Sequence, residues 1–326
     1  MKIRHSTWFW LLTISLLMLT ACQSATIEPT PVLVMPTTAA PTPIVPPLAE
    51  ATLPPVPTTV IEPSPTLPAA AEATATAVPT SPVSTPSAYR VAFVTSDDTL
   101  NVRSGPGVDF DIVGELAPQA GGLQITGSGQ DVDGSTWVPV TNGSVTGWVN
   151  GRFLTADMPA ADFCKDDAVT ALLAEFATAI TNRDNGKLAQ LINPERGLRV
   201  RLNWWNPEVL IRGTDRANLF TATGSYDWGV ADGSGNPIHG SFADVVAPML
   251  VDDLLPASET GCDKLLSGPT AGLVQLPDGY ETVHYISLYR PAADESGFDW
   301  GTWVVGVEWW NGRYTISYLV HFDWEI

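Results

Sequence analysis

Hydrophobic positions follow four different patterns along the 326-residue chain. Residues 8–19 form one short apolar run, and residues 23–88 contain no aromatic residue. Residues 89–157 carry short runs of alternating apolar and polar residues, whereas residues 160–326 begin with helical spacing and end with alternation. These patterns predict a signal segment over 1–22, a disordered linker over 23–88, a small β-domain over 89–157 and an α+β domain over 160–326.

The first folded region consists of closely spaced runs that favour β-structure. We expect strands at Arg90–Thr95, Leu100–Arg103, Ile112–Leu116, Leu123–Thr126, Trp137–Val140 and Gly147–Val149. Pro106 followed by Gly107 suits a type II turn after the second strand. Short strands separated by turn residues indicate a small all-β barrel.

The second folded region starts with helical spacing. Apolar residues recur every three to four positions within Asp166–Thr181, so we expect an amphipathic helix there. Lys187–Ile192 predicts a second short helix, and the apolar residues between Phe242 and Leu250 predict a later one.

Alternation replaces helical spacing near the C-terminal end of the sequence. We expect strands at Glu281–Tyr289, Thr302–Trp310 and Arg313–Phe322, with Asn311-Gly312 as a strong hairpin signal between the last two. Alternation places one set of side chains of the last strand on a common face: Tyr314, Ile316, Tyr318, Val320 and Phe322. Helices first and an antiparallel sheet last predict an α+β domain with helices on one face; a nuclear transport factor 2-like cone is one such architecture.

Composition and charge narrow the choice of partners. Proline and threonine dominate residues 23–88, which also lack Gly, Lys and Arg. Such a segment buries too little apolar surface to offset chain entropy, so we expect it to stay extended and disordered. The formal net charge of the chain is −19. A chain this acidic is repelled by phosphate backbones, so we expect no nucleic-acid partner.

The segment Leu19-Thr20-Ala21-Cys22 closes a stretch that begins with Lys2, Arg4 and the apolar run. Small residues before a cysteine resemble the lipobox of bacterial lipoproteins. That resemblance implies that Cys22 carries lipid and that the chain is anchored to a membrane of the bacterial cell envelope on its extracytoplasmic side. An ordinary signal peptide and an uncleaved membrane anchor are the alternatives, although the apolar run is short for a spanning helix.

Two further cysteines, Cys164 and Cys262, form an even pair if Cys22 carries lipid. We expect a disulfide between them, and closing so long a loop contributes on the order of 4 kcal/mol. Two buried free thiols or one reactive thiol are the alternatives. Neither cysteine has a Cys or His neighbour at ligand spacing, so we expect no metal site, and no motif calls for a cofactor.

The first folded region resembles the bacterial SH3-like domains. The resemblance is carried by Leu100-Asn101-Val102-Arg103-Ser104-Gly105-Pro106-Gly107, Val113-Gly114-Glu115-Leu116, Trp137-Val138-Pro139-Val140, Gly147-Trp148-Val149 and Phe153-Leu154. It implies a binding module, since some members of the family bind peptidoglycan peptides. Trp137 and Trp148 are either core residues or ligand contacts, and we expect Arg103 to support the turn through backbone carbonyls.

The second folded region has a less informative resemblance. Tyr226-Asp227-Trp228-Gly229, residues 232–238 and the closing residues 321–326 resemble a domain of uncharacterised bacterial lipoproteins. That resemblance implies no catalytic residue. Ser234 lies between two glycines in a polar loop, which is a poor setting for a nucleophile.

Candidate chemistry in the second region centres on histidine. His239, His284 and His321 form no recognisable zinc motif. We hypothesise one cluster that either binds a polar ligand or closes the sheet through hydrogen bonds: Asp227, Trp228, His239, His321 and Asp323. We expect His284 to be a surface or cross-strand residue. The pairs Trp204-Trp205 and Trp309-Trp310 each place one ring away from the core, where a sugar can stack on it.

Three functional hypotheses follow. The leading one is a non-enzymatic, lipid-anchored envelope protein that binds peptidoglycan or a surface partner through the SH3-like domain. The second is a C-terminal domain that binds or senses a small ligand. The third is an envelope hydrolase with its site around Asp227, His239 and His321.

Overall fold

The computed structural model describes residues 86–324. The predicted signal segment, the lipidation site Cys22 and nearly all of the predicted linker lie outside the described residues. Among the described residues, no helix is both long enough and apolar enough to cross a membrane.

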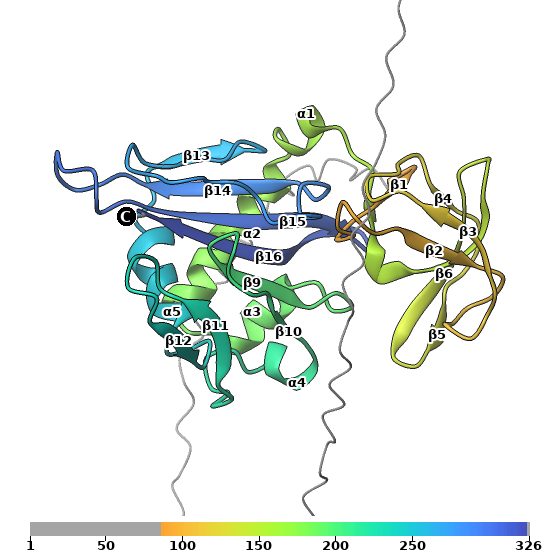
Figure 1. Ribbon diagram of the computed structural model, residues 1–326, viewed down its shortest axis with the longest axis horizontal. Coiled ribbons are helices and arrows are strands. Elements are labelled where there is room, and N and C mark those ends of the chain that lie inside the picture. The colour runs from red at the N-terminus through yellow and green to blue at the C-terminus, as the bar shows by residue number, and fades with distance from the viewer. Residues whose placement is uncertain (1–85, 325–326) are drawn as a thin grey trace, which may run out of the picture. The chain divides into compact units, whose positions relative to one another are not determined.

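The N-terminal part of the described chain is a small β-barrel (Figure 1). One sheet has the strand order β3-β2-β7-β6-β4, with β5 paired to β6, and β1 pairs with β8. The strands are β1 (Tyr89–Val91), β2 (Leu100–Arg103), β3 (Ile112–Leu116), β4 (Gln124–Ile125), β5 (Gln130–Val132), β6 (Ser135–Thr141), β7 (Thr146–Asn150) and β8 (Leu154–Ala156), with a 3₁₀ turn η1 (Gly151–Phe153) before the last. Small aliphatic side chains such as Val102, Val140 and Val149 fill the barrel core.

The first predicted strand of the barrel is too long and one strand was missed. The strand expected at Arg90–Thr95 ends at Val91, because Phe93 adopts a positive φ of 57° and turns the chain. The side chain of Phe93 then packs with residues of the second domain rather than with the barrel core. Strand β5 was missed because it is short and exposed, with no apolar run to mark it.

The second domain begins with helices, as expected: α1 (Ala160–Phe163), α2 (Asp167–Thr181) and α3 (Asn185–Leu191). Strands that the sequence analysis did not predict then precede two later helices, α4 (Gly213–Arg216) and α5 (Val246–Met249), so the helices do not all come first. A π-helical turn η2 (Leu250–Leu254) follows α5. Asp166 caps α2 by accepting a hydrogen bond from the backbone N–H of Ala168. The helix predicted between Phe242 and Leu250 corresponds to α5, which is shorter than expected and continues directly into the π turn η2.

A six-stranded sheet with the order β10-β9-β16-β15-β14-β13 forms the rest of the domain. Its strands are β9 (Leu198–Leu202), β10 (Val209–Ile211), β13 (Glu259–Cys262), β14 (Tyr285–Arg290), β15 (Gly301–Trp310) and β16 (Arg313–Asp323). Strands β11 (Tyr226–Val230) and β12 (Pro237–Gly240) pair separately as a hairpin. All pairings are antiparallel except that of β16 with β9. The predicted hairpin is confirmed, with positive φ angles of 45° at Asn311 and 86° at Gly312.

A bulge in β16 divides the last strand between two cores. Val307 pairs with Ile316 and Gly306 pairs with Tyr318, so Ser317 is the extra residue. The prediction that alternate residues from Tyr314 to Phe322 share one face was therefore wrong, because the bulge reverses the direction of every side chain after it. Gly306 accommodates the change, since a Cβ there would lie 2.1 Å from the ring of Tyr318.

Each face of the sheet is consequently covered. Helices α2 and α3 and the α5–η2 segment cover one face (Figure 1) and pack with Ile316 and Leu319. Loop residues before β14, together with Phe93, cover the other face and pack with Tyr318. The ring of Phe93 meets that of Tyr318 edge to face at 6.1 Å between centroids.

A buried ion pair fastens the end of the barrel to the sheet. The side chains of Arg196 and Glu308 are 1% and 0% exposed, and they form a two-pronged pair with N–O distances of 2.7 and 2.8 Å. The same guanidinium donates to the carbonyl oxygens of Arg152 and Leu154 in the barrel, the latter at 2.7 Å. It also lies 4.7 Å from the ring centroid of Phe93. The guanidinium is therefore compensated by partners from both the barrel and the second domain.

We expect Arg196→Met to lower the free energy of unfolding by about 3–5 kcal/mol, because it leaves the carboxylate of Glu308 buried without its cation. The double variant Arg196→Met/Glu308→Leu should recover much of that loss, since it removes both charges. Urea unfolding followed by tryptophan fluorescence measures both. A single variant within 1 kcal/mol of wild type would contradict a structural role for the pair.

Candidate functional site

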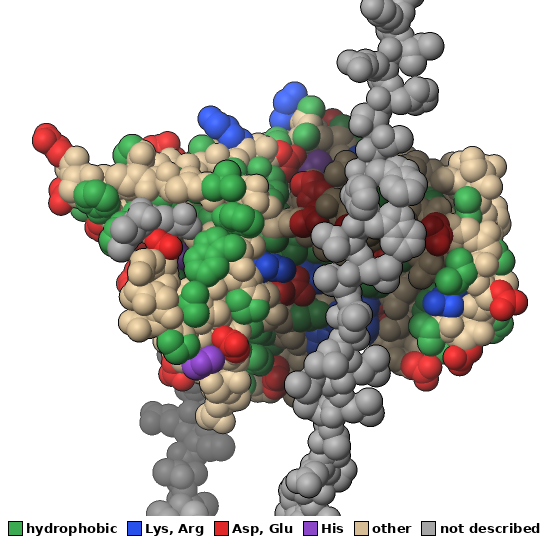
Figure 2. Space-filling model, in the orientation of Figure 1, with side chains coloured by type: hydrophobic (Ala, Val, Ile, Leu, Met, Phe, Trp, Pro, Cys, Tyr) green, Lys and Arg blue, Asp and Glu red, His purple; other side chains and the backbone are tan. Residues whose placement is uncertain are grey.

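A cavity of about 260 Å³ opens where β16 ends. His321 and Asp323 reach it from β16, and Asp232 reaches it from the turn of the β11–β12 hairpin. Two exposed tryptophans, Trp205 and Trp324, complete the rim. Hydrophobic and acidic side chains lie side by side on the surface over this end of the sheet (Figure 2).

A charged array supports the inner wall of the cavity. Nε2 of His321 donates to Oδ2 of Asp253 at 2.6 Å, and Arg290 donates to Oδ1 of the same carboxylate at 2.6 and 2.9 Å. Burial acts to raise the pKa of Asp253, but hydrogen bonds and charges from His321 and Arg290 outweigh it and lower that pKa. Gly301 allows the close approach, since a Cβ there would lie 2.3 Å from the Asp253 carboxyl carbon.

The predicted cluster of five residues is divided in the structure. His321 and Asp323 line the cavity. Asp227 and His239 face each other across the β11–β12 hairpin at 3.6 Å, but both side chains are largely exposed and neither lines the cavity. Trp228 is fully buried and donates to the carbonyl of Gly240, so it is a structural residue. The third hypothesis thus lacks the juxtaposition of Asp227 with His321 on which it depended.

The carboxylate that does pair with His321 was missed by the sequence analysis. Asp253 lies 68 residues earlier in the chain and belongs to the π turn η2. Its only local signal is that it belongs to an acidic pair, Asp252-Asp253, between apolar residues. The cavity-lining residues Trp205, Trp324 and Asp232 were likewise not grouped with His321.

The barrel carries a second hollow of about 380 Å³, next to a clamped loop. Arg103 donates to the carbonyl oxygens of Val108 at 2.7 Å and Phe110 at 2.8 Å, which is the structural role expected for it. Val108 and Trp137 both line the hollow. Trp137 is 5% exposed, whereas Trp148 is half-buried, pairs across the strands with Arg103 and Pro139, and does not line the hollow.

The loop after Arg103 and the start of β3 expose several large apolar side chains. Val108, Phe110, Ile112 and Val113 are 65%, 45%, 52% and 52% exposed. Phe110 lies flat over Gly105, where a Cβ would lie 2.3 Å from the ring. Exposed apolar side chains gathered on one loop, here those of Val108 and Phe110, make this loop a candidate interaction site.

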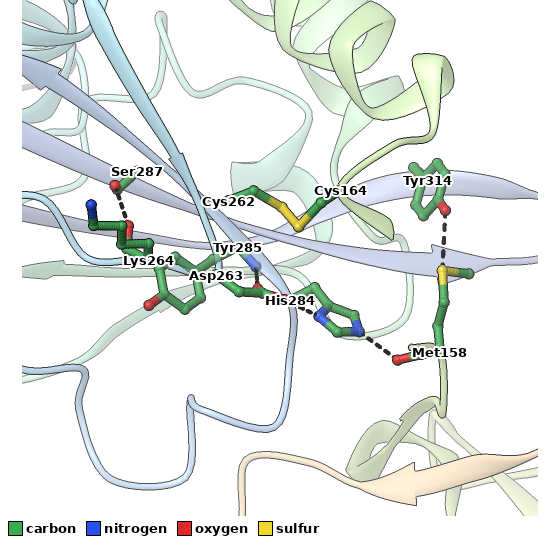
Figure 3. The surroundings of a disulfide bond; sticks show 9 residues. All are labelled: Met158, Cys164, Cys262, Asp263, Lys264, His284, Tyr285, Ser287 and Tyr314. Atoms are coloured by element: carbon green, nitrogen blue, oxygen red, sulfur yellow. Dashed lines mark hydrogen bonds and ion pairs between the residues drawn. A yellow bond between two sulfur atoms is a disulfide. The ribbon is translucent and has the colours of Figure 1, made fainter. Parts of the chain in front are cut away.

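The predicted disulfide between Cys164 and Cys262 is confirmed, with Cα atoms 5.8 Å apart (Figure 3). It ties the segment at α1 to strand β13, 98 residues later. The cysteine sulfurs lie near the Asp263 carboxylate, but they are engaged in the disulfide and offer no thiolate to a metal.

His284, expected to be a surface or cross-strand residue, takes part in the packing beside this disulfide (Figure 3). Its Nδ1 donates to Asp263 at 2.6 Å, its Nε2 lies 2.8 Å from the carbonyl oxygen of Met158, and its ring stacks on Phe163 with centroids 4.7 Å apart. Of the two expected settings, the surface one was wrong, because the side chain is only 17% exposed. The cross-strand one holds for the backbone, since the carbonyl oxygen of His284 accepts a hydrogen bond from the N–H of Val307 on β15 at 2.8 Å. Burial acts to lower the pKa of His284, but the hydrogen bond and charge of Asp263 outweigh it and raise that pKa.

Comparison with known proteins identifies a family for the barrel. A family model described as "Bacterial SH3 domain" matches residues 98–155. No curated protein matches the chain. A solved structure whose title begins "Rd1NTF2_05" covers 48% of this chain and 97% of its own length at 11% identity, with a TM-score of 0.23. A likeness at that level does not establish the cone expected for the second domain.

We expect the stabilising effect of His284 to depend on pH. Because its pKa in the folded protein is raised above the ordinary 6.5, the stabilisation is fully present below that value and is lost as pH rises through the folded pKa. The difference in unfolding free energy between wild type and His284→Gln should therefore shrink as pH rises above the ordinary pKa of 6.5. Chemical denaturation at each pH measures it, and a difference that grows with pH would contradict the ion pair with Asp263.

Proposed function

We propose that the protein is a non-enzymatic binding protein of the bacterial cell envelope, held at a membrane by lipid on Cys22. In this proposal its SH3 domain binds peptidoglycan peptides or a surface partner. The observation that carries the proposal is the bacterial SH3 match over residues 98–155, within which the clamped apolar loop lies. Bacterial SH3 domains suggest cell-wall binding at a general level.

The chemistry of the loop supports a peptide ligand. Two exposed acidic residues, Asp109 and Asp111, flank the exposed ring of Phe110. An acidic and apolar surface complements a peptide that carries amino groups and small apolar side chains. The clamp by Arg103 holds the loop in one conformation before binding, which lowers the entropy lost on association.

A second candidate function is small-ligand binding by the C-terminal domain. The cavity at the end of β16 favours it, because apolar walls there meet a small number of polar groups. A nuclear transport factor 2-like cone would provide such a cavity, and we keep that architecture as part of this second proposal.

We expect Phe110→Ser to reduce retention of the full chain on purified cell wall by at least roughly tenfold, the effect of losing one central aromatic contact. Its fold should persist, because the ring is 45% exposed. Leu273→Ser is the matched control, since Leu273 is 62% exposed but belongs to the second domain. Equal retention of Phe110→Ser, Leu273→Ser and wild type in a sedimentation assay would refute binding through this loop.

We expect Cys22→Ser to abolish incorporation of labelled palmitate and to release the protein from the membrane fraction, because serine lacks the thiol that is alkylated. Labelling of cells that express each form, followed by fractionation, measures both effects. Cys164→Ser serves as the control, since it should still incorporate label. Undiminished labelling of the Cys22 variant would disprove the anchor.

A further inference from the structure

A cavity of about 470 Å³ lies between the barrel and the turn of the β15–β16 hairpin. The barrel lines it from β6, β8 and the 3₁₀ turn η1, and the second domain lines it from the hairpin and from the residues after α3. Its walls combine aromatic rings with one carboxylate, that of Glu195. We propose that this cavity binds a primary ammonium group on an apolar stem. This inference is independent of the proposed wall binding, because Phe110 and its neighbours in the clamped loop do not line the cavity.

Apolar side chains form most of the cavity wall. The lining rings are Tyr89 from β1, and Trp309 and Trp310 from the end of β15. The barrel adds the aliphatic side chains of Ile125 and Val138. A cavity of this size holds a small organic ligand, and aromatic rings offer it both apolar contact and the negative potential of their faces. The stem of the ligand is therefore apolar.

Glu195 supplies the charge of the cavity and lacks hydrogen-bond donors. It is the one charged residue among the described residues that line the cavity, and it is half-buried. Its Oε2 is buried and accepts no hydrogen bond from the described residues. Its Oε1 accepts from the hydroxyl of Thr136, but that hydroxyl also lies 2.6 Å from Oδ1 of Asp131. One hydroxyl carries one proton, so the two carboxylates share a single donor.

The neighbouring arginines do not supply the missing donors. Arg196 is committed to Glu308 and to carbonyl oxygens of the barrel. Arg152 donates to the carbonyl oxygen of Gly134. None of the ion pairs formed within residues 86–324 includes Glu195. A buried carboxylate oxygen without a donor costs free energy, so a ligand that brings positive charge and N–H groups is favoured here and an anion is repelled.

The wall that carries this carboxylate is held in place before any ligand binds. The backbone N–H of Glu195 donates to Oδ1 of Asn193 at 3.0 Å. The next residue, Arg196, donates to the carbonyl oxygen of the lining residue Leu154 at 2.7 Å. A preformed wall lowers the entropy lost on binding. A primary ammonium carries three N–H donors for the carboxylate, whereas a quaternary ammonium carries none.

Ligands that share a stem and differ in the head group test the charge. Isothermal titration of the full chain, purified in detergent, is carried out with pentylamine, pentanol and pentanoate, and with 2-phenylethylamine and 2-phenylethanol. Each ligand is also titrated into detergent alone. We expect the tighter of the two amines to bind at least roughly tenfold more tightly than the alcohol of the same stem, with no heat from pentanoate. That amine identifies the stem as aliphatic or aromatic. Binding of neither amine, or binding of the alcohol or of pentanoate as tight as that of the amine, would overturn the proposal.

Substitutions at the cavity wall place the binding there. Glu195→Gln keeps the size of the side chain and an acceptor for Thr136, so it should remove the preference for the amine over the alcohol. Trp310→Leu should weaken amine binding by roughly three- to fivefold. Because Trp310 is half-buried at the end of β15, this variant tests the cavity even if Glu195→Gln disturbs the contact with the barrel.

The matched controls carry the same substitutions outside the cavity. Glu115→Gln, at an exposed position of β3, and Trp324→Leu, at a side chain that is 39% exposed, should bind the amine as wild type does. Phe110→Ser should also bind the amine normally, so a failure of wall binding and a failure of this site can be told apart. A preference for the amine that persists in Glu195→Gln, or an equal loss in the controls, would refute the assignment to this cavity.

Discussion

The buried pair of Arg196 and Glu308 is the interaction on which the arrangement of this protein depends. Two charges can stay in a dry interior only if nearly all of their hydrogen-bonding capacity is met. The guanidinium meets part of it with barrel carbonyls, and Asn193 donates to the same carboxylate at 2.8 Å. The second domain therefore completes its own interior with atoms of the barrel. The SH3 domain of this chain therefore shares a core with the second domain and does not pack independently of it.

Phe93 connects the buried Arg196–Glu308 pair to the packing of the sheet. Its positive φ takes the side chain out of the barrel and between the guanidinium groups of Arg196 and Arg199, at 4.7 and 4.4 Å from the ring centroid. The same ring packs against Tyr318, which faces that side only because of the bulge at Ser317. Two local departures from regular strand geometry thus build one core. With both faces of the sheet covered, the end of β16 is where its polar side chains meet an open cavity.

The parts of the fold that follow from neighbouring residues could be predicted from the sequence. Asn311-Gly312 identifies its hairpin because the turn itself requires those residues, and Asp166 starts α2 because its side chain caps the helix. The disulfide followed from the count of cysteines. The bulge at Ser317, by contrast, depends on the fit of Tyr318 over Gly306 across the strand pair. The pairing of His321 with Asp253 joins residues 68 positions apart in the chain, and a local sequence pattern does not predict contacts over such a separation.

The acidic composition of the chain acquires a local meaning at the cavity. A net charge of −19 is by itself only a statement about solubility and long-range repulsion. Part of that charge has a local structural role, because the carboxylate of Asp253 accepts hydrogen bonds from both His321 and Arg290. Asp232 and Asp323 then face the cavity beside exposed indole rings. Asp253, and not the total charge, therefore determines how this end of the sheet is held, since Arg290 belongs to β14 and His321 to β16.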